Sequence, residues 1–414
     1  MTDAAIASMR LTKQQPFVLF WLARLASTLG YQMMAVTIGW SIYDITGSAF
    51  DLGLVGLIQF VPAVVFTLLI GHFADRYDRR LIVRVSQTVS AVAAALVLIA
   101  FIAHALTLAL LFGAVFLIGC GRAFEVPTSH ALVPILVPQP LIPRAVASWA
   151  SASQTAIICG PAAGGLIYAI SPMLVCVICL TFFIISIALV TIIKIDRPPP
   201  PREPPTLSSV LAGIKFIRTR VRLLGVVSLD LFVTLLGGVT ALLPIYARDI
   251  LDAGPSGLGL LRSAPAIGAL TVSVLLAHFP IERRIGIKMF SAVALFGLAT
   301  IAFSLSAWLP LSMVALAVLG ASDSVSVVVR FSLVQIETPD AMRGRVTAIN
   351  SLFVGTSNTL GEFESGMLAA LLGAVPAAFL GGLGSLLVAM TWMWLFPDLR
   401  RIDRYEPADD IGRA

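Results

Sequence analysis

The sequence has little charge. Only 12% of its 414 residues are Asp, Glu, Lys or Arg, which is about half the share found in soluble domains. Hydrophobic residues make up 58% of the chain. A soluble fold of this size could not bury so much apolar surface, whereas side chains that face lipid need no burial. The shortage of charge therefore excludes a large soluble domain and indicates an all-α membrane protein.

Cysteine and histidine are also scarce, with four residues of each. Cys176 and Cys179 form a Cys-x-x-Cys pair within an apolar run, but no second pair or nearby His completes a zinc site. The sequence also lacks a Gly-x-Ser-x-Gly elbow, a His-Glu-x-x-His helix and a Gly-rich nucleotide loop. We therefore expect no enzymatic activity, no metal and no cofactor, and ATP-driven pumping is disfavoured.

The net charge of +6 does not indicate a nucleic-acid partner. Lys and Arg fall almost wholly in short segments between apolar runs, where they suit anionic lipid headgroups and set topology. Membrane lipids, and not nucleic acids, are the expected partners of this charge.

Apolar runs long enough to cross a bilayer predict twelve transmembrane helices. The predicted spans of the first half are 17–42, 51–72, 81–103, 106–126, 145–170 and 173–194. Those of the second half are 223–246, 257–279, 288–307, 309–335, 345–372 and 376–396.

Basic residues alternate between the two sides of these spans. The segments that follow odd-numbered spans contain Arg248 and hardly any other basic residue, whereas the opposite side holds nearly all the rest. Because positive loops stay in the cytoplasm, we expect a multi-pass protein of the cell (inner) membrane with both termini cytoplasmic.

A proline-rich segment divides the chain into two similar halves. We expect an N-terminal six-helix bundle over 1–194, a cytoplasmic linker with an amphipathic helix over 195–222, and a C-terminal six-helix bundle with its tail over 223–414. A shift of 201 residues superimposes Gly119 on Gly320, Gly160 on Gly361 and other positions without a gap. Parallel repeats of this kind are typical of carriers in which one bundle rocks against the other around a midplane site.

The segment Gly71–Arg80 reads Gly-His-Phe-Ala-Asp-Arg-Tyr-Asp-Arg-Arg. It resembles the loop signature of the major facilitator superfamily, Gly-x-x-x-Asp-Arg-x-x-Arg-Arg, between the second and third spans. The resemblance implies a cytoplasmic gate that uses Gly71, Asp75, Arg76, Arg79 and Arg80, in which charges pair when the cytoplasmic face is closed. Asp78 stands where the signature usually has Gly. The alternative is that these charges only set topology.

Three further segments resemble the drug- and siderophore-exporting branch of that superfamily, which includes the bacterial enterobactin exporter. They are Gly121–Pro138, Met342–Val346 and Gly361–Gly366. With the loop signature, the resemblance covers nearly the whole chain and implies the major facilitator fold.

Seven ionisable residues within predicted spans are candidates for proton coupling or substrate contact, because charge inside a membrane is costly and mostly functional. They are Arg24, Arg122, Glu125, Asp323, Arg330, Glu362 and Glu364. Carboxylates removed from water can bind and release protons near neutral pH, as a proton antiporter requires. Arg122 and Glu125 share a helix face and could instead form a structural pair. Asp230 is expected near a helix end or in a structural role.

These features favour a secondary active transporter that exports amphipathic small molecules, such as drugs or siderophores, in exchange for protons. A nutrient or metabolite importer on the same fold is an alternative, because a fold does not set direction. A non-transporting membrane receptor or scaffold is an alternative of another class. No feature names an oligomeric partner, and a monomer is expected.

Overall fold

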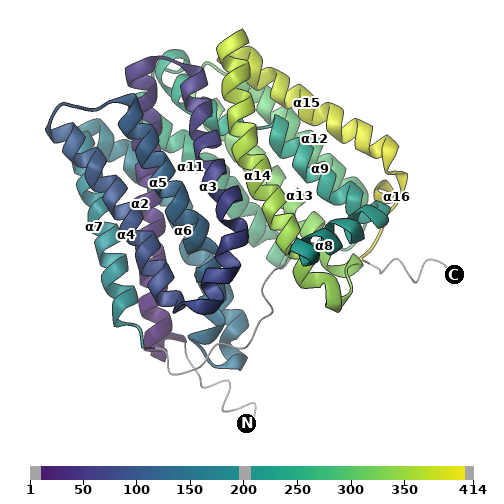
Figure 1. Ribbon diagram of the computed structural model, residues 1–414. Coiled ribbons are helices and arrows are strands. Elements are labelled where there is room, and N and C mark those ends of the chain that lie inside the picture. The colour runs from purple at the N-terminus through teal and green to yellow at the C-terminus, as the bar shows by residue number, and fades with distance from the viewer. Residues whose placement is uncertain (1–10, 195–206, 406–414) are drawn as a thin grey trace. The chain divides into compact units, whose positions relative to one another are not determined.

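The computed structural model describes residues 11–194 and 207–405 (Figure 1). In these ranges the regular elements are helices, and no strand occurs in them. Ten helical segments of the described chain are long and apolar enough to cross a membrane, which confirms an all-α membrane protein. Two further helices, α2 (Gln15–Thr46) and α14 (Asp340–Leu372), have 32 and 33 residues and suffice by length alone. Twelve crossings therefore remain our expectation.

Contacts between Cα atoms divide the chain into two compact units. Unit 1 comprises Met1–Gly47, Ile58–Pro204 and Gly254–Ser263. Unit 2 comprises Ser48–Leu57, Pro205–Ala253 and Ala264–Ala414. The first turns of α3 thus belong to unit 2, and those of α11 belong to unit 1.

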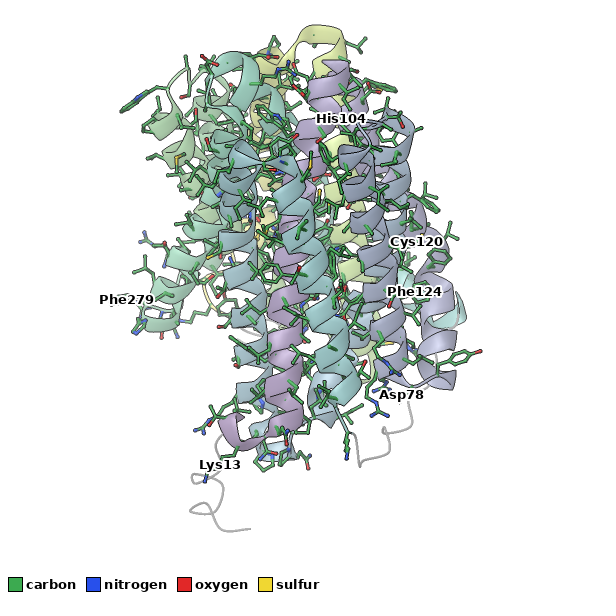
Figure 2. All side chains as sticks on the ribbon, turned by 90° about the vertical axis from the view of Figure 1, so that its left-hand side faces the viewer. Lys13, Asp78, His104, Cys120, Phe124 and Phe279 are labelled. Carbon is green, nitrogen blue, oxygen red and sulfur yellow. The ribbon has the colours of Figure 1, made fainter. Side chains whose placement is uncertain are left out.

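Polar caps start several helices of unit 1. The side chains of Asp78, Thr107 and Ser171 each accept a hydrogen bond from a backbone N–H of the helix that follows, which satisfies an otherwise free donor. Besides α2, the helices are α3 (Ala49–Arg76), α4 (Arg79–Ile102), α5 (Leu108–Leu132), α6 (Ile142–Ile170) and α7 (Pro172–Ile192). Lys13 and Asp78 lie at one end of this unit and His104 at the other, so α4 runs its full length (Figure 2).

Unit 2 begins, within the described chain, with the short helix α8 (Leu207–Thr219), whose Gly213 packs on Ile349 and Arg345 of α14. Residues 195–206, which form part of the predicted linker, lie outside the described residues. The longer helices are α9 (Val221–Leu236), α11 (Gly254–His278), α12 (Ile285–Ser304), α13 (Leu309–Glu337), α14 and α15 (Ala374–Leu395).

Helix pairing repeats from one half of the sequence to the other. In the first half, α2 packs on α6 and α7, and α4 packs on α5 and α7. In the second, α9 packs on α14 and α15, and α12 packs on α13 and α15. Close glycine contacts follow the same pattern, since Gly119 lies against Pro62 and Gly320 lies against Pro265. The predicted internal repeat is confirmed at this level.

The seventh predicted span, 223–246, is not one continuous helix. Helix α9 ends at Leu236, and the chain continues through a 3₁₀ turn (Val239–Leu242), the short α10 (Leu243–Ile245) and a π-helical turn (Tyr246–Ile250). Gly237 and Gly238 stand at the interruption, and a methyl group on Gly238 would lie 2.5 Å from the carbonyl oxygen of Gly361 on α14. Paired glycines and a close neighbouring backbone account for the break, which hydropathy alone does not show.

Candidate functional site

The predicted gate residues lie around the junction of α3 and α4. Gly71, Asp75 and Arg76 fall on the last turns of α3, where the structure describes the helix but not the side chains. Arg79 is buried and donates to the carbonyl oxygen of Ala131 at 3.1 Å. Arg79 of the motif therefore joins the start of α4 to the end of α5.

Asp78, the residue that departs from the family signature, caps α4 and pairs with Arg80. Its carboxylate accepts from the backbone N–H of Arg80 at 2.9 Å and from the guanidinium Nη2 at 2.6 Å. The same guanidinium donates to the carbonyl oxygen of Ile193 at 2.6 Å. The hydrogen bond from the Arg80 side chain, more than any other cause, holds the pKa of Asp78 below its ordinary value. The aspartate at this position, where the family signature has Gly, thus gives Arg80 an intramolecular partner.

Four polar side chains from α2, α4 and α5 meet in the interior of unit 1, and we call them the Glu125 cluster: Arg24, Ser27, Gln87 and Glu125. One carboxylate oxygen of Glu125 accepts from Ser27 Oγ at 3.0 Å and from Gln87 Nε2 at 3.2 Å. A guanidinium nitrogen of Arg24 lies 4.0 Å from the same oxygen. Arg24 and Glu125 expose only 8% and 5% of their surface, so two charges and their donors are removed from water.

Arg24 is held in place from its other side. Its Nε donates to Ser153 Oγ on α6 at 3.1 Å, and its guanidinium carbon lies 5.0 Å from the centroid of the Trp149 ring. Trp149 itself belongs to a buried apolar group that includes Phe17, Phe20 and Leu132. This apolar packing shields the Glu125 cluster on one side and strengthens electrostatic interactions within it.

Arg122, one turn before Glu125, makes a different contact. Its guanidinium carbon lies 3.7 Å from the centroid of the Tyr31 ring, and the Tyr31 hydroxyl donates to Gln59 Oε1 at 3.3 Å. Glu125 pairs with Arg24 of α2, while Arg122 stacks on an aromatic ring, so the two do not form the local pair that their spacing allows.

A second charged group lies in unit 2, and we call it the Arg330 cluster: Asp230, Asp323 and Arg330. The guanidinium of Arg330, 5% exposed, forms an ion pair with Asp230 of α9 and lies 3.5 Å from an oxygen of Asp323. One cation thus faces two carboxylates, and the side chain of Asp323 is 48% exposed. Asp230 is thereby placed in a charged contact between α9 and α13.

Glu362 and Glu364 lie on α14 and face different neighbours. A methyl group on Gly56 of α3 would lie 2.9 Å from the Glu362 Cβ, whereas Glu364 accepts from Ser365 Oγ at 3.4 Å. The adjacent Gly361 packs closely against the carbonyl oxygens of Thr234 and Leu235, just before the break after α9. The glycines of this helix therefore permit close packing, and α14 itself is unbroken.

Sequence reasoning did not identify Ser27, Gln87, Ser153 or Trp149. Neutral polar and aromatic residues are frequent in apolar helices, and only the packing of α2, α4, α5 and α6 gathers these four around one ion pair. Among residues 11–194 and 207–405, no three His, Cys, Asp or Glu side chains are grouped as metal ligands.

Comparison with known proteins identifies the family of this chain. A family model described as Transmembrane secretion effector matches residues 6–410. Enterobactin exporter EntS of Citrobacter koseri is 27% identical over 423 residues, which cover 98% of each protein. The protein of the same name from Escherichia coli O139:H28 is 27% identical over 420 residues, 97% of each.

Solved structures agree on the fold. The nucleoside transporter NupG has a TM-score of 0.69 at 14% identity, covering 92% of this chain and 99% of that one. A bacterial homologue of the human lysosomal transporter Spinster has a TM-score of 0.74 at 13% identity, covering 96% and 100%. At this identity they show the fold alone. The chain belongs to the transmembrane secretion effector family and has the major facilitator fold, which confirms the resemblance seen in its motifs.

Proposed function

We propose that this protein exports siderophore-like amphipathic small molecules and exchanges them for protons. Near full-length similarity to proteins named enterobactin exporters supports export and the class of cargo. The same similarity favours an exporter over an importer, a non-transporting scaffold or an enzyme.

The observation that carries the proton-coupling proposal is the environment of Glu125. This carboxylate is buried and has two neutral donors, and its cation lies 4.0 Å away instead of at hydrogen-bonding distance. Asp230, by contrast, is in direct contact with Arg330. A carboxylate with a loosely held cation can exchange a proton at lower cost than one in a tight ion pair.

Protonation of Glu125 would change the cluster in a defined way. The negative charge opposite Arg24 disappears, and the new O–H requires an acceptor. Gln87 Oε1 is buried and accepts no hydrogen bond within the described residues. Rotation of the Gln87 amide would present that oxygen to the protonated acid, so α4 and α5 remain joined while Arg24 is released to contact an anionic cargo.

The arrangement in the membrane follows from the same proposal. The bundles 1–194 and 223–414 rock against each other as a monomer in the inner membrane, with the linker 195–222 and both termini on the cytoplasmic side. Protons, cargo and membrane lipids are its partners, and alternating access exposes the Glu125 cluster to each side in turn.

Uptake of a labelled catechol siderophore by inside-out vesicles tests the proposal. We expect accumulation when the interior is acidified and none when the gradient is dissipated. Glu125→Gln should abolish gradient-driven accumulation, whereas Glu282→Gln, a matched change at an exposed position, should preserve it. Uptake into right-side-out vesicles driven by external acid would instead support an importer, and full activity of Glu125→Gln would exclude Glu125 as the proton carrier.

A further inference from the structure

A cavity of about 350 Å³ lies between α3, α4 and α5 of unit 1, and we call it the α3–α4–α5 slot. Its lining is almost wholly apolar and includes Phe66, Leu81, Val85, Val89, Cys120 and Phe124. Figure 2 shows Cys120 and Phe124 along one side of the unit, between the levels of His104 and Asp78. None of these side chains belongs to the Glu125 cluster.

The slot opens on the outer face of α4. Leu81 and Val85, four residues apart on α4, lie along its rim and are 41% and 54% exposed, and Tyr77, just before the helix, is 51% exposed. Side chains at this spacing share one side of a helix. In a membrane protein, apolar side chains exposed on the outside of a transmembrane helix face lipid.

The inner end of the slot is closed. The rings of Phe66 and Phe124 pack with their centroids 5.2 Å apart. Behind them α4 and α5 are in close contact, since a methyl group on Gly121 would lie 2.7 Å from the carbonyl oxygen of Ser86. A chain that entered from the lipid side could therefore not continue toward Glu125. The slot has the form of a receptacle and not of a passage for cargo.

Positive charge lies beside the slot at the loop end of α4. Arg84 immediately precedes the rim residue Val85 in the sequence, and its Nε is buried without a hydrogen-bond partner within the described residues. Arg80 is occupied by Asp78 and the Ile193 carbonyl, whereas Arg84 keeps a donor for a further partner. Basic side chains at this depth attract anionic headgroups.

We propose that the α3–α4–α5 slot binds one acyl chain of an anionic phospholipid whose headgroup lies next to Arg84. The hydrophobic effect does not favour the slot over the bilayer, because both are apolar. Binding instead rests on packing of the chain against the aromatic floor and on attraction between Arg84 and the headgroup. This site is separate from the proposed transport chemistry.

Photo-crosslinking tests the site without relying on transport. The full-length protein is placed in nanodiscs that contain phosphatidylglycerol with a diazirine in one acyl chain, then irradiated and mapped by peptide mass spectrometry. We expect adducts to concentrate on residues 77–89 and 120–124. Adducts spread evenly over the lipid-facing helices would overturn the proposal, and so would adducts that excess catechol siderophore displaces, since these would mark a cargo site.

Two matched substitutions on α4 sharpen the result. Val89→Phe fills the slot and should lose the labelling, whereas Val92→Phe, at an exposed position outside the slot, should keep it. Arg84→Gln should remove the preference for phosphatidylglycerol over phosphatidylethanolamine carrying the same diazirine chain. Equal labelling by the two lipids in the unaltered protein would contradict the anionic specificity, and unchanged labelling in Val89→Phe would place the lipid elsewhere.

Discussion

Removing either member of the Arg24–Glu125 pair should destabilise the protein by an amount that can be reasoned from its geometry. Two unit charges 4.0 Å apart attract by about 4 kcal/mol at an effective dielectric constant near 20. Leaving one charge of a buried pair without its partner costs about 3–5 kcal/mol. We therefore expect Glu125→Gln to lower the free energy of unfolding by about 3 kcal/mol, although Gln keeps an oxygen for Ser27 and Gln87.

The two single substitutions should not be equivalent. Arg24→Gln leaves a carboxylate that can take up a proton and become neutral, whereas Glu125→Gln leaves a guanidinium that cannot lose its charge. Arg24→Gln should therefore cost less than Glu125→Gln.

A double-mutant cycle measured by equilibrium unfolding in mixed micelles tests this reasoning. The double variant should be more stable than the sum of the single effects predicts, by about 2 kcal/mol. Glu282→Gln, at an exposed position, should stay within about 0.5 kcal/mol of the unaltered protein. Single effects that add to the double effect within about 0.5 kcal/mol would refute an energetic link between Arg24 and Glu125.

Three other predictions concern packing and charge elsewhere. Gly121→Ala should destabilise by about 1–3 kcal/mol, because its methyl group would lie 2.7 Å from a carbonyl oxygen of α4; Gly113→Ala on the same helix meets no atom within 4 Å and should stabilise by about 0.5–1 kcal/mol, as thermal unfolding of both variants can show. The depressed pKa of Asp78 means that its pairing contributes stability above about pH 4, near the ordinary Asp value, and that this contribution is lost as the pH falls through the lower native value; acid unfolding curves should show a smaller acid-induced loss for Asp78→Asn, and identical curves would contradict this. Arg330→Gln leaves Asp230, whose side chain is 14% exposed, without its cation and should cost about 3 kcal/mol, whereas a loss below about 1 kcal/mol in the same unfolding assay would show that the pair is not held together in the membrane.

Sequence periodicity predicted the helices well and their interruptions poorly. A long apolar run bounded by charged residues can form little other than a helix in lipid, so the helices occur where the hydropathy of the sequence predicts them. The break after Leu236 depends on how closely Gly238 approaches Gly361. Helix α5 likewise continues through Pro127 to Leu132, beyond its predicted end at residue 126. Contacts between distant segments decide such details, and a local pattern does not contain them.

For the charged candidates, the sequence identified the residues but not their partners. Because ionisable side chains are energetically costly in lipid, the sequence alone identified Arg24, Glu125 and Arg330 as candidates. The structure gives each of them a polar or charged contact. The sequence did not predict their partners. Helical spacing suggested Arg122 as the neighbour of Glu125, whereas the actual cation is Arg24 of α2. Asp78 illustrates the reverse case, since a departure from a family motif became interpretable once its bond to Arg80 was known.

The central claim is that Glu125 carries the proton that is exchanged for cargo. Purified protein in liposomes that enclose a pH-sensitive dye tests it most directly, with proton movement and isotope exchange of a catechol siderophore recorded in the same preparation. The account predicts that cargo triggers proton movement in the unaltered protein, and that Glu125→Gln abolishes this movement while cargo-for-cargo exchange continues. Cargo-induced proton movement of equal size in Glu125→Gln would contradict the account.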